Sequence, residues 1–320
     1  MKRVVVVGSF NVDHVWTTTT LPRPGETLAG RYASGPGGKG FNQAVAAARA
    51  GARTSFLCAL GDDAGGQLAR ALATADGIDL RDQRSTMPTG TAGIYVDGEG
   101  RNSIVIGPGA NADLSNEFVA GQQDAIAGAG VLLAQLESPP DAVADALRRA
   151  RAAGVMTLLN PAPANAPTTP ALLSLVDVLT PNESEFSTLV SHHVGTRIDD
   201  DVVATLDQSS LHALCRQLLP DGSVVITLGA SGCLVSHPDA TLRDDATACY
   251  RIAAETAHAI DTTGAGDAFN GALAASLADA PQAPFATHVR FASRYAALST
   301  ERAGAAMSMP RRDEVLARFQ

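Results

Sequence analysis

The glycine-rich segment at residues 261–271 carries the residue types best suited to chemistry. Gly264, Ala265 and Gly266 lie where a helix is expected to begin, so their backbone N–H groups are predicted to be free to bind an anion. Asp267 follows them directly, and a carboxylate beside an anion site is useful where it accepts a proton from an attacking hydroxyl group. We therefore interpret Asp267 as a candidate general base, with an ordinary acidic residue at a helix start as the alternative.

A second glycine-rich segment, residues 35–43, also precedes an expected helix. Its glycines allow close approach of the backbone, while Lys39, Asn42 and Gln43 add one cation and two amides, which suit a ligand rich in hydroxyl groups. Lys39 is one of only two lysines among the 24 basic residues. The segment also fits G-x-G-x-x-G, the pattern of nicotinamide-dependent dehydrogenases, but it does not directly follow the first expected strand, which argues against such an enzyme. A structural turn is the other alternative.

Three further segments place polar residues at the ends of expected strands. Asn11 and Asp13 alternate along an extended segment and can point into one crevice, although an Asx turn would also use them. Asn182 and Glu185 share one face of an expected helix, and their oxygen ligands suit Mg²⁺, with helix capping as the alternative. Residues 227–232 form a strand followed by a glycine turn, which lets the backbone pass close to a nucleotide.

These segments must be positioned by a regular alternation of strands and helices. Short β-branched runs alternate with Ala/Leu-rich stretches, which predicts an α/β fold with a mostly parallel sheet covered by helices on both faces. Such a sheet binds ligands beyond the carboxyl ends of its strands. The expected strands are residues 4–7, 54–59, 131–136, 156–159, 176–179, 224–228 and 233–235. The expected helices are residues 42–50, 67–75, 140–153, 183–190, 211–219, 265–277 and 285–298.

Two stretches interrupt this alternation. Residues 12–20 are polar and β-branched, and residues 91–96 and 102–106 flank an Asp-Gly-Glu-Gly hairpin signal. Together with residues 31–34 they predict a small antiparallel flap, with an ordinary edge hairpin as the alternative. We expect one domain over residues 1–320, with flap strands inserted at about 12–36 and 90–108. Residues 191–210 are expected to form a surface excursion, and residues 161–170 a loop.

Composition narrows the functional classes. Hydrophobic residues make up 45% and charged residues 18%, which excludes wholesale disorder. The net charge is −9 with no basic stripe, which argues against nucleic acid or an anionic membrane as a partner. The chain has no apolar run long enough for a membrane span, so we expect a soluble, cytoplasmic protein. Four scattered cysteines, Cys58, Cys215, Cys233 and Cys249, fit neither a disulfide framework nor a zinc site.

Taken together, the motifs resemble the ribokinase-like (phosphofructokinase B) family of sugar kinases. The correspondence runs in order over nearly the whole chain. It includes Gly8-Ser-Phe-Asn-Val-Asp-His14, Gly37-Gly-Lys-Gly-Phe-Asn-Gln43, Gln135-Leu-Glu137, Asn160-Pro-Ala-Pro163, Thr180-Pro-Asn-Glu183 and residues 261–271. The two glycine motifs, far apart and in this order, are highly specific to the family. The first motif together with Gly-Gly-Lys-Gly-x-Asn-Gln favours D-ribose as the phosphoryl acceptor.

The resemblance implies a role for each matching residue. Asp267 would deprotonate the sugar 5-hydroxyl for attack on the γ-phosphate of ATP, while the 264–266 turn would hold the transition-state charge. Besides Asp267, the implied sugar-binding residues are Asn11, Asp13, Gly38, Lys39, Asn42 and Glu137. The implied nucleotide-binding residues are Asn182, Thr227, Leu228, Gly229, Ala230, Ser231, Gly232, Gly266 and Ser293.

The resemblance also implies cations and a quaternary structure. Asn182 and Glu185 would organise the Mg²⁺ that accompanies ATP, partly through water. A monovalent cation such as K⁺ would act as an activator, bound mostly by backbone atoms. Its implied residues are Asp261, Thr263, Ser299, Arg302, Gly304 and Ser308. The flap would serve as a lid and as the interface of a homodimer.

Two residues depart from the family pattern. Phe41 is bulky where ribose kinases often carry a small residue, and Ser293 stands where an asparagine is common beside the nucleotide base. Related acceptors such as fructose, deoxyribose or a nucleoside therefore remain alternatives to ribose. A non-catalytic sugar-binding sensor with a kinase fold is a third, more distant alternative.

Overall fold

The central sheet is mostly parallel, which confirms the predicted fold class. The structure, a computed structural model, describes residues 2–239 and 245–319. The strand order is β13-β12-β11-β10-β9-β8-β1-β4-β5, in which β12 runs antiparallel to both of its neighbours, β11 and β13, and the other pairs are parallel. The strands are β1 (Arg3–Val7), β4 (Arg53–Gly61), β5 (Asp79–Ser85), β8 (Ala129–Ala134), β9 (Met156–Leu159), β10 (Val178–Leu179), β11 (Ser223–Thr227), β12 (Cys233–Ser236) and β13 (Cys249–Ile252).

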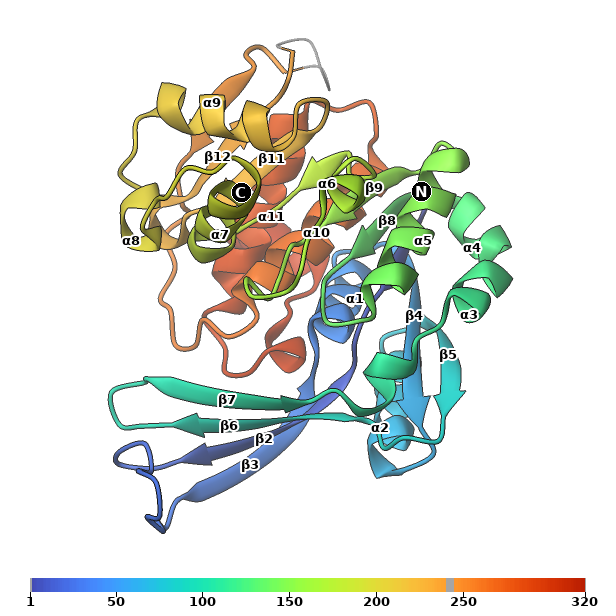
Figure 1. The fold of residues 1–320 in the computed structure, drawn as a ribbon, viewed down its shortest axis with the longest axis vertical. Helices are drawn as coiled ribbons and strands as arrows, with labels where there is room; N and C mark the ends of the chain where they lie inside the picture. The colour runs from blue at the N-terminus through green and yellow to red at the C-terminus, as the bar shows by residue number, and fades with distance from the viewer. Residues whose placement is uncertain (1, 240–244, 320) are drawn as a thin grey trace.

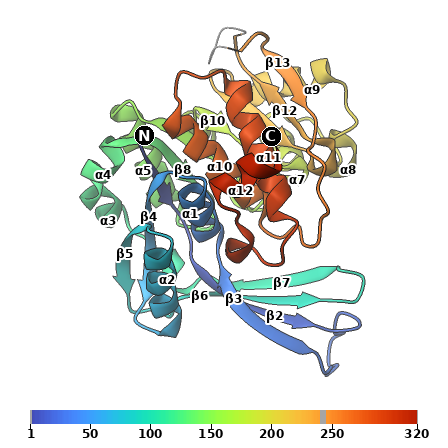
Figure 2. The ribbon, with the colours of Figure 1, turned by 180° about the vertical axis from the view of Figure 1, so that it is seen from behind.

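Helices cover both faces of this sheet because its central strands are apolar on both sides. In β1, Val4 and Val6 join one buried cluster and Val5 and Val7 the other. The first cluster packs under α1 (Lys39–Arg49), α2 (Ala64–Ala75), α10 (Ala265–Asp279), α11 (Phe285–Ser299) and α12 (Arg312–Arg318), which face the viewer in Figure 2. The second packs under α3 (Asn116–Gly121), α4 (Gln123–Ala127), α5 (Pro140–Ala152), α6 (Pro170–Leu173), α7 (Glu183–His193), α8 (Asp200–Val203) and α9 (Gln208–Leu218), seen in Figure 1.

Helices α1 and α10 pack unusually closely, and a glycine makes this possible. A Cβ added at Gly271 would lie 2.4 Å from the backbone oxygen of Gln43 and 2.5 Å from the Cβ of Ala46. Only a residue without a side chain fits this crossing. The close packing brings the first turn of α10 against the side chains at the start of α1.

A second, four-stranded sheet projects from the α/β body (Figure 1). Its order is β3-β2-β6-β7, with strands β2 (Asn11–Thr17), β3 (Arg31–Gly37), β6 (Gly90–Val96) and β7 (Asn102–Gly107). The pairs β2–β3 and β6–β7 are antiparallel, and the two pairs are joined by parallel pairing of β2 with β6. At the expected 97–100 turn, the carboxylate of Asp97 accepts hydrogen bonds from the backbone amides of Glu99 and Arg101.

Several elements differ from the sequence expectations. Strand β5 is rich in charged residues, and edge-strand ion pairs such as Arg70–Asp82 at 2.6 Å accommodate them. Strand β8 ends at Ala134 rather than at residue 136, because the chain turns there and the amide of Leu136 bonds to Ala162 instead. Residues 191–210 include the end of α7, α8 and the start of α9, and Val203 is buried in the core, so the segment is more than a surface excursion. The expected loop at 161–170 is irregular up to α6.

Two sequence observations can be compared directly with the structure. Cys58, Cys215, Cys233 and Cys249 are all free thiols. Across residues 2–239 and 245–319, the structure holds no helix that is both long and apolar enough to cross a membrane.

Candidate active site

Asp267 lies buried in the first turn of α10, lines a cavity and is held by two amide side chains of α1. Its Oδ2 accepts from Asn42 Nδ2 and its Oδ1 from Gln43 Nε2, both at 2.9 Å. Burial raises the pKa of the Asp267 carboxyl, while the ammonium of Lys39 and the two amide donors oppose that rise. The arrangement fixes a carboxylate in place and brings its pKa toward the range useful for a base.

The turn before Asp267 presents backbone amides, although not quite as the sequence predicts. Gly264 adopts a left-handed conformation with φ of 76° and begins α10 without a side-chain cap. The amide of Ala265 donates to the oxygen of Thr262 at 3.1 Å, because a tight turn precedes the helix. Among the described residues, the amides of Gly264, Gly266 and Asp267 itself have no hydrogen-bond partner. The candidate anion site is thus made by these three amides rather than by 264–266 in succession.

The predicted sugar-binding residues gather around the same carboxylate. The amide of Lys39 donates to Glu137 Oε2 at 3.0 Å, and the hydroxyl of Ser9 donates to the same oxygen at 2.6 Å. Gly38 has φ of 86°, and a Cβ there would lie 2.8 Å from the backbone nitrogen of Asn11, so glycine is required at this crossing.

Asn111 is a residue that the sequence analysis missed. Its side-chain amide bonds to the backbone nitrogen of Phe10 at 3.0 Å, to the backbone oxygen of Phe10 at 2.9 Å and to Asn11 Oδ1 at 2.8 Å. Asn111 is itself buried. It therefore fixes the orientation of Asn11 at the start of β2. Its signal in the sequence, an asparagine among alanines at residues 109–113, is too common to be noticed.

The charges in this region are strongly coupled. Burial raises the pKa of Asp13 to about 6, and repulsion from Glu137 and Asp267 adds to the rise, with Lys39 opposing it. Burial by itself lowers the pKa of the Lys39 amine, but the surrounding carboxylates, Asp267 first, raise it above its ordinary value. Lys39 therefore stays charged at the centre of an acidic cluster.

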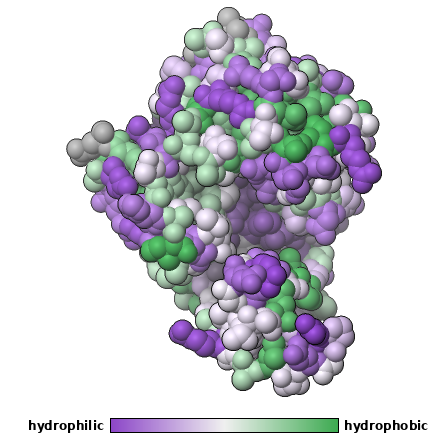
Figure 3. Space-filling view, turned by 90° about the vertical axis from the view of Figure 1, so that its left-hand side faces the viewer, coloured by the Kyte–Doolittle hydropathy of each residue, from purple (hydrophilic) through white to green (hydrophobic). Residues whose placement is uncertain are grey.

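Asn182, Glu185 and Thr227 line the same cavity as Asp267, which measures about 170 Å³. Its other lining residues are Lys39, Asn160, Ala162, Thr180, Thr262, Gly264, Ala265, Gly266 and Asn270. In the space-filling view, a hydrophilic hollow separates the α/β body from the four-stranded sheet (Figure 3).

Asn182 and Glu185 also form a capping box at the start of α7. The amide of Glu185 donates to Asn182 Oδ1 at 2.8 Å, and the amide of Asn182 donates to Glu185 Oε2 at 2.9 Å. Burial raises the pKa of Glu185. The capping role is therefore real, and it leaves the second oxygen of Glu185 for the cavity. Within the described ranges, no group of three or more His, Cys, Asp or Glu side chains is placed to hold a metal. This donor set fits a Mg²⁺ ion that keeps most of its water.

Residues 227–232 form the predicted strand and glycine turn. Thr227 ends β11, and Gly229–Ser231 form a short 3₁₀ helix (η2) with Gly229, Ala230 and Ser231 exposed. The amide of Leu228 donates to Gly232 across the turn at 2.8 Å. Gly232 has φ of 85°, and a Cβ there would lie 2.0 Å from the oxygen of Ile252. Ser293 on α11 lies next to the start of β12, with its hydroxyl 4.0 Å from the sulfur of Cys233.

The residues implied for a monovalent cation are only partly brought together. Asp261 accepts from the amides of Thr263 at 2.9 Å and Gly304 at 2.8 Å, which ties the two loops. The hydroxyls of Ser299 and Ser308 each donate to a backbone oxygen three residues earlier, at 2.8 Å. The guanidinium of Arg302 instead pairs with Glu314 on α12. Any contribution of Arg302 to this site is therefore limited to its backbone.

Phe41 packs into the core rather than into the cavity. It is almost fully buried and lies edge-on to Phe10, with ring centroids 5.0 Å apart, and near Phe56 at 6.0 Å. The cavity beside Asp267 is lined by other residues. Phe41 does not line this cavity, so the structure shows no contact through which it would shape a sugar pocket there.

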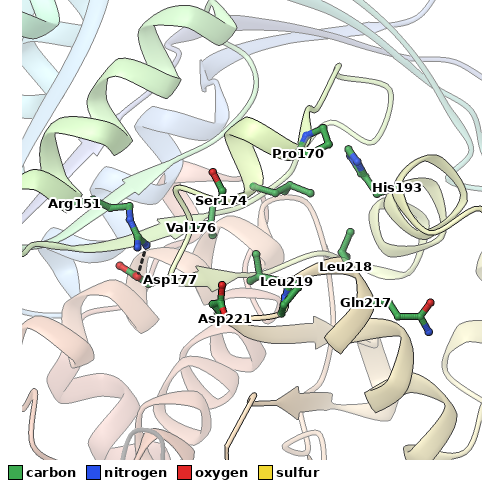
Figure 4. Close-up of a pocket in the computed structure, with 13 residues that line it drawn as sticks. Arg151, Pro170, Ser174, Val176, Asp177, His193, Gln217, Leu218, Leu219 and Asp221 are labelled. Atoms are coloured by element: carbon green, nitrogen blue, oxygen red, sulfur yellow. Dashed lines mark hydrogen bonds and ion pairs between the residues drawn. The ribbon is translucent and has the colours of Figure 1, made fainter.

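A larger cavity, of about 400 Å³, lies before the amino ends of β10 and β11 (Figure 4). Its wall combines apolar residues such as Leu218 and Leu219 with Arg151 and Asp177, which pair with each other at 2.8 Å. None of the predicted site residues lines it. The chemistry-bearing side chains gather instead at the carboxyl ends of the strands, where an open α/β sheet binds its ligands.

The comparisons with known proteins agree with this arrangement. The chain is 38% identical to the ribokinase of Haemophilus influenzae over 318 residues, covering 98% of this chain and 97% of that protein. It is also 38% identical to the ribokinase of Mus musculus over 322 residues, covering 99% and 94% of the two chains.

Solved structures give the same relationship. A crystal structure of ribokinase from Thermotoga maritima matches with a TM-score of 0.86 at 31% identity, covering 99% of each chain. The structure of Arabidopsis thaliana ribokinase complexed with ribose and ATP matches with a TM-score of 0.83 at 30% identity, covering 99% of this chain and 98% of that one. The family model of the pfkB family carbohydrate kinases matches residues 1–312 of this chain. The motif resemblance is thereby confirmed, and the chain belongs to the pfkB family of carbohydrate kinases.

Proposed function

We propose that this chain is a ribokinase, which transfers the γ-phosphoryl group of ATP to the 5-hydroxyl of D-ribose. The observation that carries the proposal is Asp267, a buried carboxylate next to three amides of the 264–267 turn that have no partner within the described part of the chain. The similarity to ribokinases over nearly the full length, including one solved with ribose and ATP, supports ribose as the acceptor.

In this proposal Asp267 accepts the proton of the 5-hydroxyl as the oxygen attacks phosphorus. The amides of Gly264, Gly266 and Asp267, at the positive end of α10, stabilise the negative charge of the transferred group. Lys39, which lines the same cavity, adds a positive charge near this position. Phosphoryl transfer needs mainly positioning and charge stabilisation, and these groups supply both.

The sugar is held by the residues gathered around Lys39. Among the described residues, the buried Oδ1 of Asn42 has no hydrogen-bond partner, so it is available to accept a sugar hydroxyl. Asp13 and Glu137 accept further hydroxyls, while Asn11 and the backbone at Gly38 complete the site. The exposed turn at residues 229–231, together with Ser293, lines the adenine side of ATP.

Asn182 and Glu185 would organise the Mg²⁺ that binds with ATP, which would neutralise charge on the phosphates. The loops tied by Asp261 would hold K⁺, mostly through backbone oxygens of residues 261–263 and 299–308. The α/β body and the four-stranded sheet form one domain, with the sheet as a lid that excludes water from the site.

The lid sheet also provides the interface of a proposed homodimer. Tyr32, Ile104, Val105 and Ile106 lie on this sheet and are 56%, 51%, 67% and 45% exposed. Such a group of exposed apolar side chains is typical of a protein–protein contact. We place the enzyme in the cytoplasm, where ATP and phosphorylated sugars are found.

The test is a panel of acceptors assayed for ADP release with Mg·ATP, in K⁺ and in matched choline chloride. We expect D-ribose to be preferred over fructose, 2-deoxyribose and nucleosides, and K⁺ to raise the rate. Replacing Asp267 with Asn should lower kcat by at least about 10²-fold. Preference for another acceptor would refute ribose as the substrate. A kcat of D267N within a few-fold of wild type would refute Asp267 as the general base. Binding of ribose without turnover would favour a sugar-binding sensor.

A further inference from the structure

A closed ring of hydrogen bonds ties Asp267 to the rest of the active site. Gln43 Nε2 donates to Asp267 Oδ1 at 2.9 Å and to Asn160 Oδ1 at 3.0 Å. Asn160 Nδ2 donates to the oxygen of Thr180 at 3.0 Å, and the Thr180 hydroxyl donates to Asn270 Oδ1. Asn270 Nδ2 donates to the oxygen of Gly266 at 2.8 Å, which returns the ring to Asp267. We call the side chains and backbone groups of Gln43, Asn160, Thr180, Asn270, Gly266 and Asp267 the amide ring.

Gln43 is the member of the amide ring whose amide is fully used. Both hydrogens of its NH₂ group are donated, and its Oε1 accepts from Gln135 Nε2 at 2.6 Å. The Gln43 side chain is fully buried, at 0% exposure, so it presents no surface to a bound substrate. Any effect of Gln43 on the reaction must therefore pass through another residue.

We propose that Gln43 is a positioning residue, which aims the carboxylate of Asp267 and couples its orientation to the amides of the anion site through the amide ring. One oxygen of Asp267 is held by Gln43 and the other by Asn42, so rotation of the carboxylate breaks one of these bonds. Among the described residues, Asn42 Oδ1 has no hydrogen-bond partner and can accept one from the proposed sugar, whereas the Gln43 amide has all of its hydrogen bonds made within the protein. This inference rests on the proposed kinase function.

A role through Asp267 can be measured as a change in its titration. A hydrogen bond donated to a carboxylate favours its charged form, so loss of the Gln43 donor raises the pKa of Asp267. The other charged groups that act on Asp267 are Lys39 on α1, Glu137 after β8, Asp13 on β2 and Glu185 on α7. All four are unchanged in the variants below, so a shift reports the missing donor.

The experiment compares Q43L, the isosteric Q43E and the control Q135M. Q135M removes the bond from Gln135 to Gln43 but touches no atom of Asp267. kcat is measured from pH 5 to 9 at saturating ribose and Mg·ATP, with the denaturant midpoint of each variant. We expect Q43L to lower kcat about tenfold and to shift the acidic side of the kcat–pH profile, here called the acid limb, to higher pH by about one unit. We expect Q43E to shift the acid limb further, because its carboxylate repels that of Asp267. Q135M should lose stability but keep the wild-type limb.

A second comparison removes the carboxylate itself. If Gln43 acts through Asp267, then adding Q43L to D267N lowers the residual rate by less than about twofold. A purely structural tie between α1 and α10 predicts the same loss in both backgrounds, and would overturn the proposal. So would an acid limb in Q43E that coincides with that of wild type, a result that holds even if Q43L does not fold. A wild-type chain that prefers another sugar overturns ribose alone, and the Gln43 comparison then uses that sugar.

Discussion

The substitution Gly271→Ala tests whether the spacing of α1 and α10 sets the geometry of the base. The added Cβ would lie 2.4 Å from the oxygen of Gln43, 2.5 Å from the Cβ of Ala46 and 2.8 Å from the nitrogen of Ala47. All three contacts are with helix α1, and two involve its backbone, so no flexible side chain can turn away. The two helices must move apart.

The size of the movement follows from these distances. An ordinary van der Waals contact is 3.4 Å or longer, so the contact at 2.4 Å requires a separation of about 1 Å. The same displacement stretches the 2.9 Å bond from Gln43 to Asp267 beyond hydrogen-bonding distance. Overpacking costs about 1–3 kcal/mol, and the better helix propensity of alanine returns up to about 1 kcal/mol. The net loss of stability should be about 1–2 kcal/mol.

The assay joins unfolding in urea to steady-state kinetics on ribose and ATP. We expect kcat to fall at least about tenfold, because a displacement of about 1 Å at a reacting group is costly. The matched control is Gly121→Ala, a glycine at the end of α3 with no atom within 4 Å of an added Cβ, which should leave both quantities near wild type. Unchanged stability in G271A would refute the packing argument, and lost stability with an unchanged kcat would refute its link to Asp267.

Three further predictions concern other parts of the site. Asp13→Asn should raise the thermal midpoint of the ligand-free protein at pH 7.5 but not below pH 4, because a carboxyl whose pKa is raised to about 6 opposes folding only where it is ionised. The KM of this variant for ribose should rise at least about tenfold. An equal gain in midpoint at both pH values would contradict the raised pKa of Asp13. Asn111→Ala should cost about 2–3 kcal/mol in urea unfolding and raise the KM for ribose more than that for ATP, because it removes three buried hydrogen bonds around Asn11. Phe41→Ala should cost about 3–5 kcal/mol while leaving the order of preferred acceptors unchanged, since the ring packs on Phe10 and Phe56; a switch to fructose would show that Phe41 does shape the pocket.

The fold could be predicted well where burial alone decides the local pattern. β9 was expected at residues 156–159, which is where it lies, because a short apolar run between two helices has few other uses. β5 was missed because its charges are those of an edge strand, and nothing in residues 79–85 shows that Arg3 and Arg70 will pair with them. Such pairs join residues far apart in the chain, so they depend on the finished fold.

The candidate site divides in the same way. The glycine motif pointed to Asp267 and to amides beside it, because helix starts have unpaired N–H groups in any fold. It could not show that the amide of Ala265 is taken by Thr262, since this depends on the dihedral angles of one turn. The amide ring was also missed as a unit, because Gln43, Asn160 and Asn270 come from three separate segments and meet only through the crossing at Gly271.

The charge balance of the site explains why Lys39 stands out in a chain whose other basic residues are nearly all arginine. Four carboxylates act on its ammonium, those of Asp267, Glu137, Glu185 and Asp13, so the cluster has a net charge of −3 when all five groups are ionised. A compact ammonium can lie among them at close range, whereas a planar guanidinium needs fixed partners in its own plane. A cluster this acidic repels a nucleotide unless cations or protons offset it. Protonation at Asp13, free amides at the start of α10 and a divalent cation each reduce that repulsion, so ATP binding should weaken most steeply when Mg²⁺ is withheld at high pH.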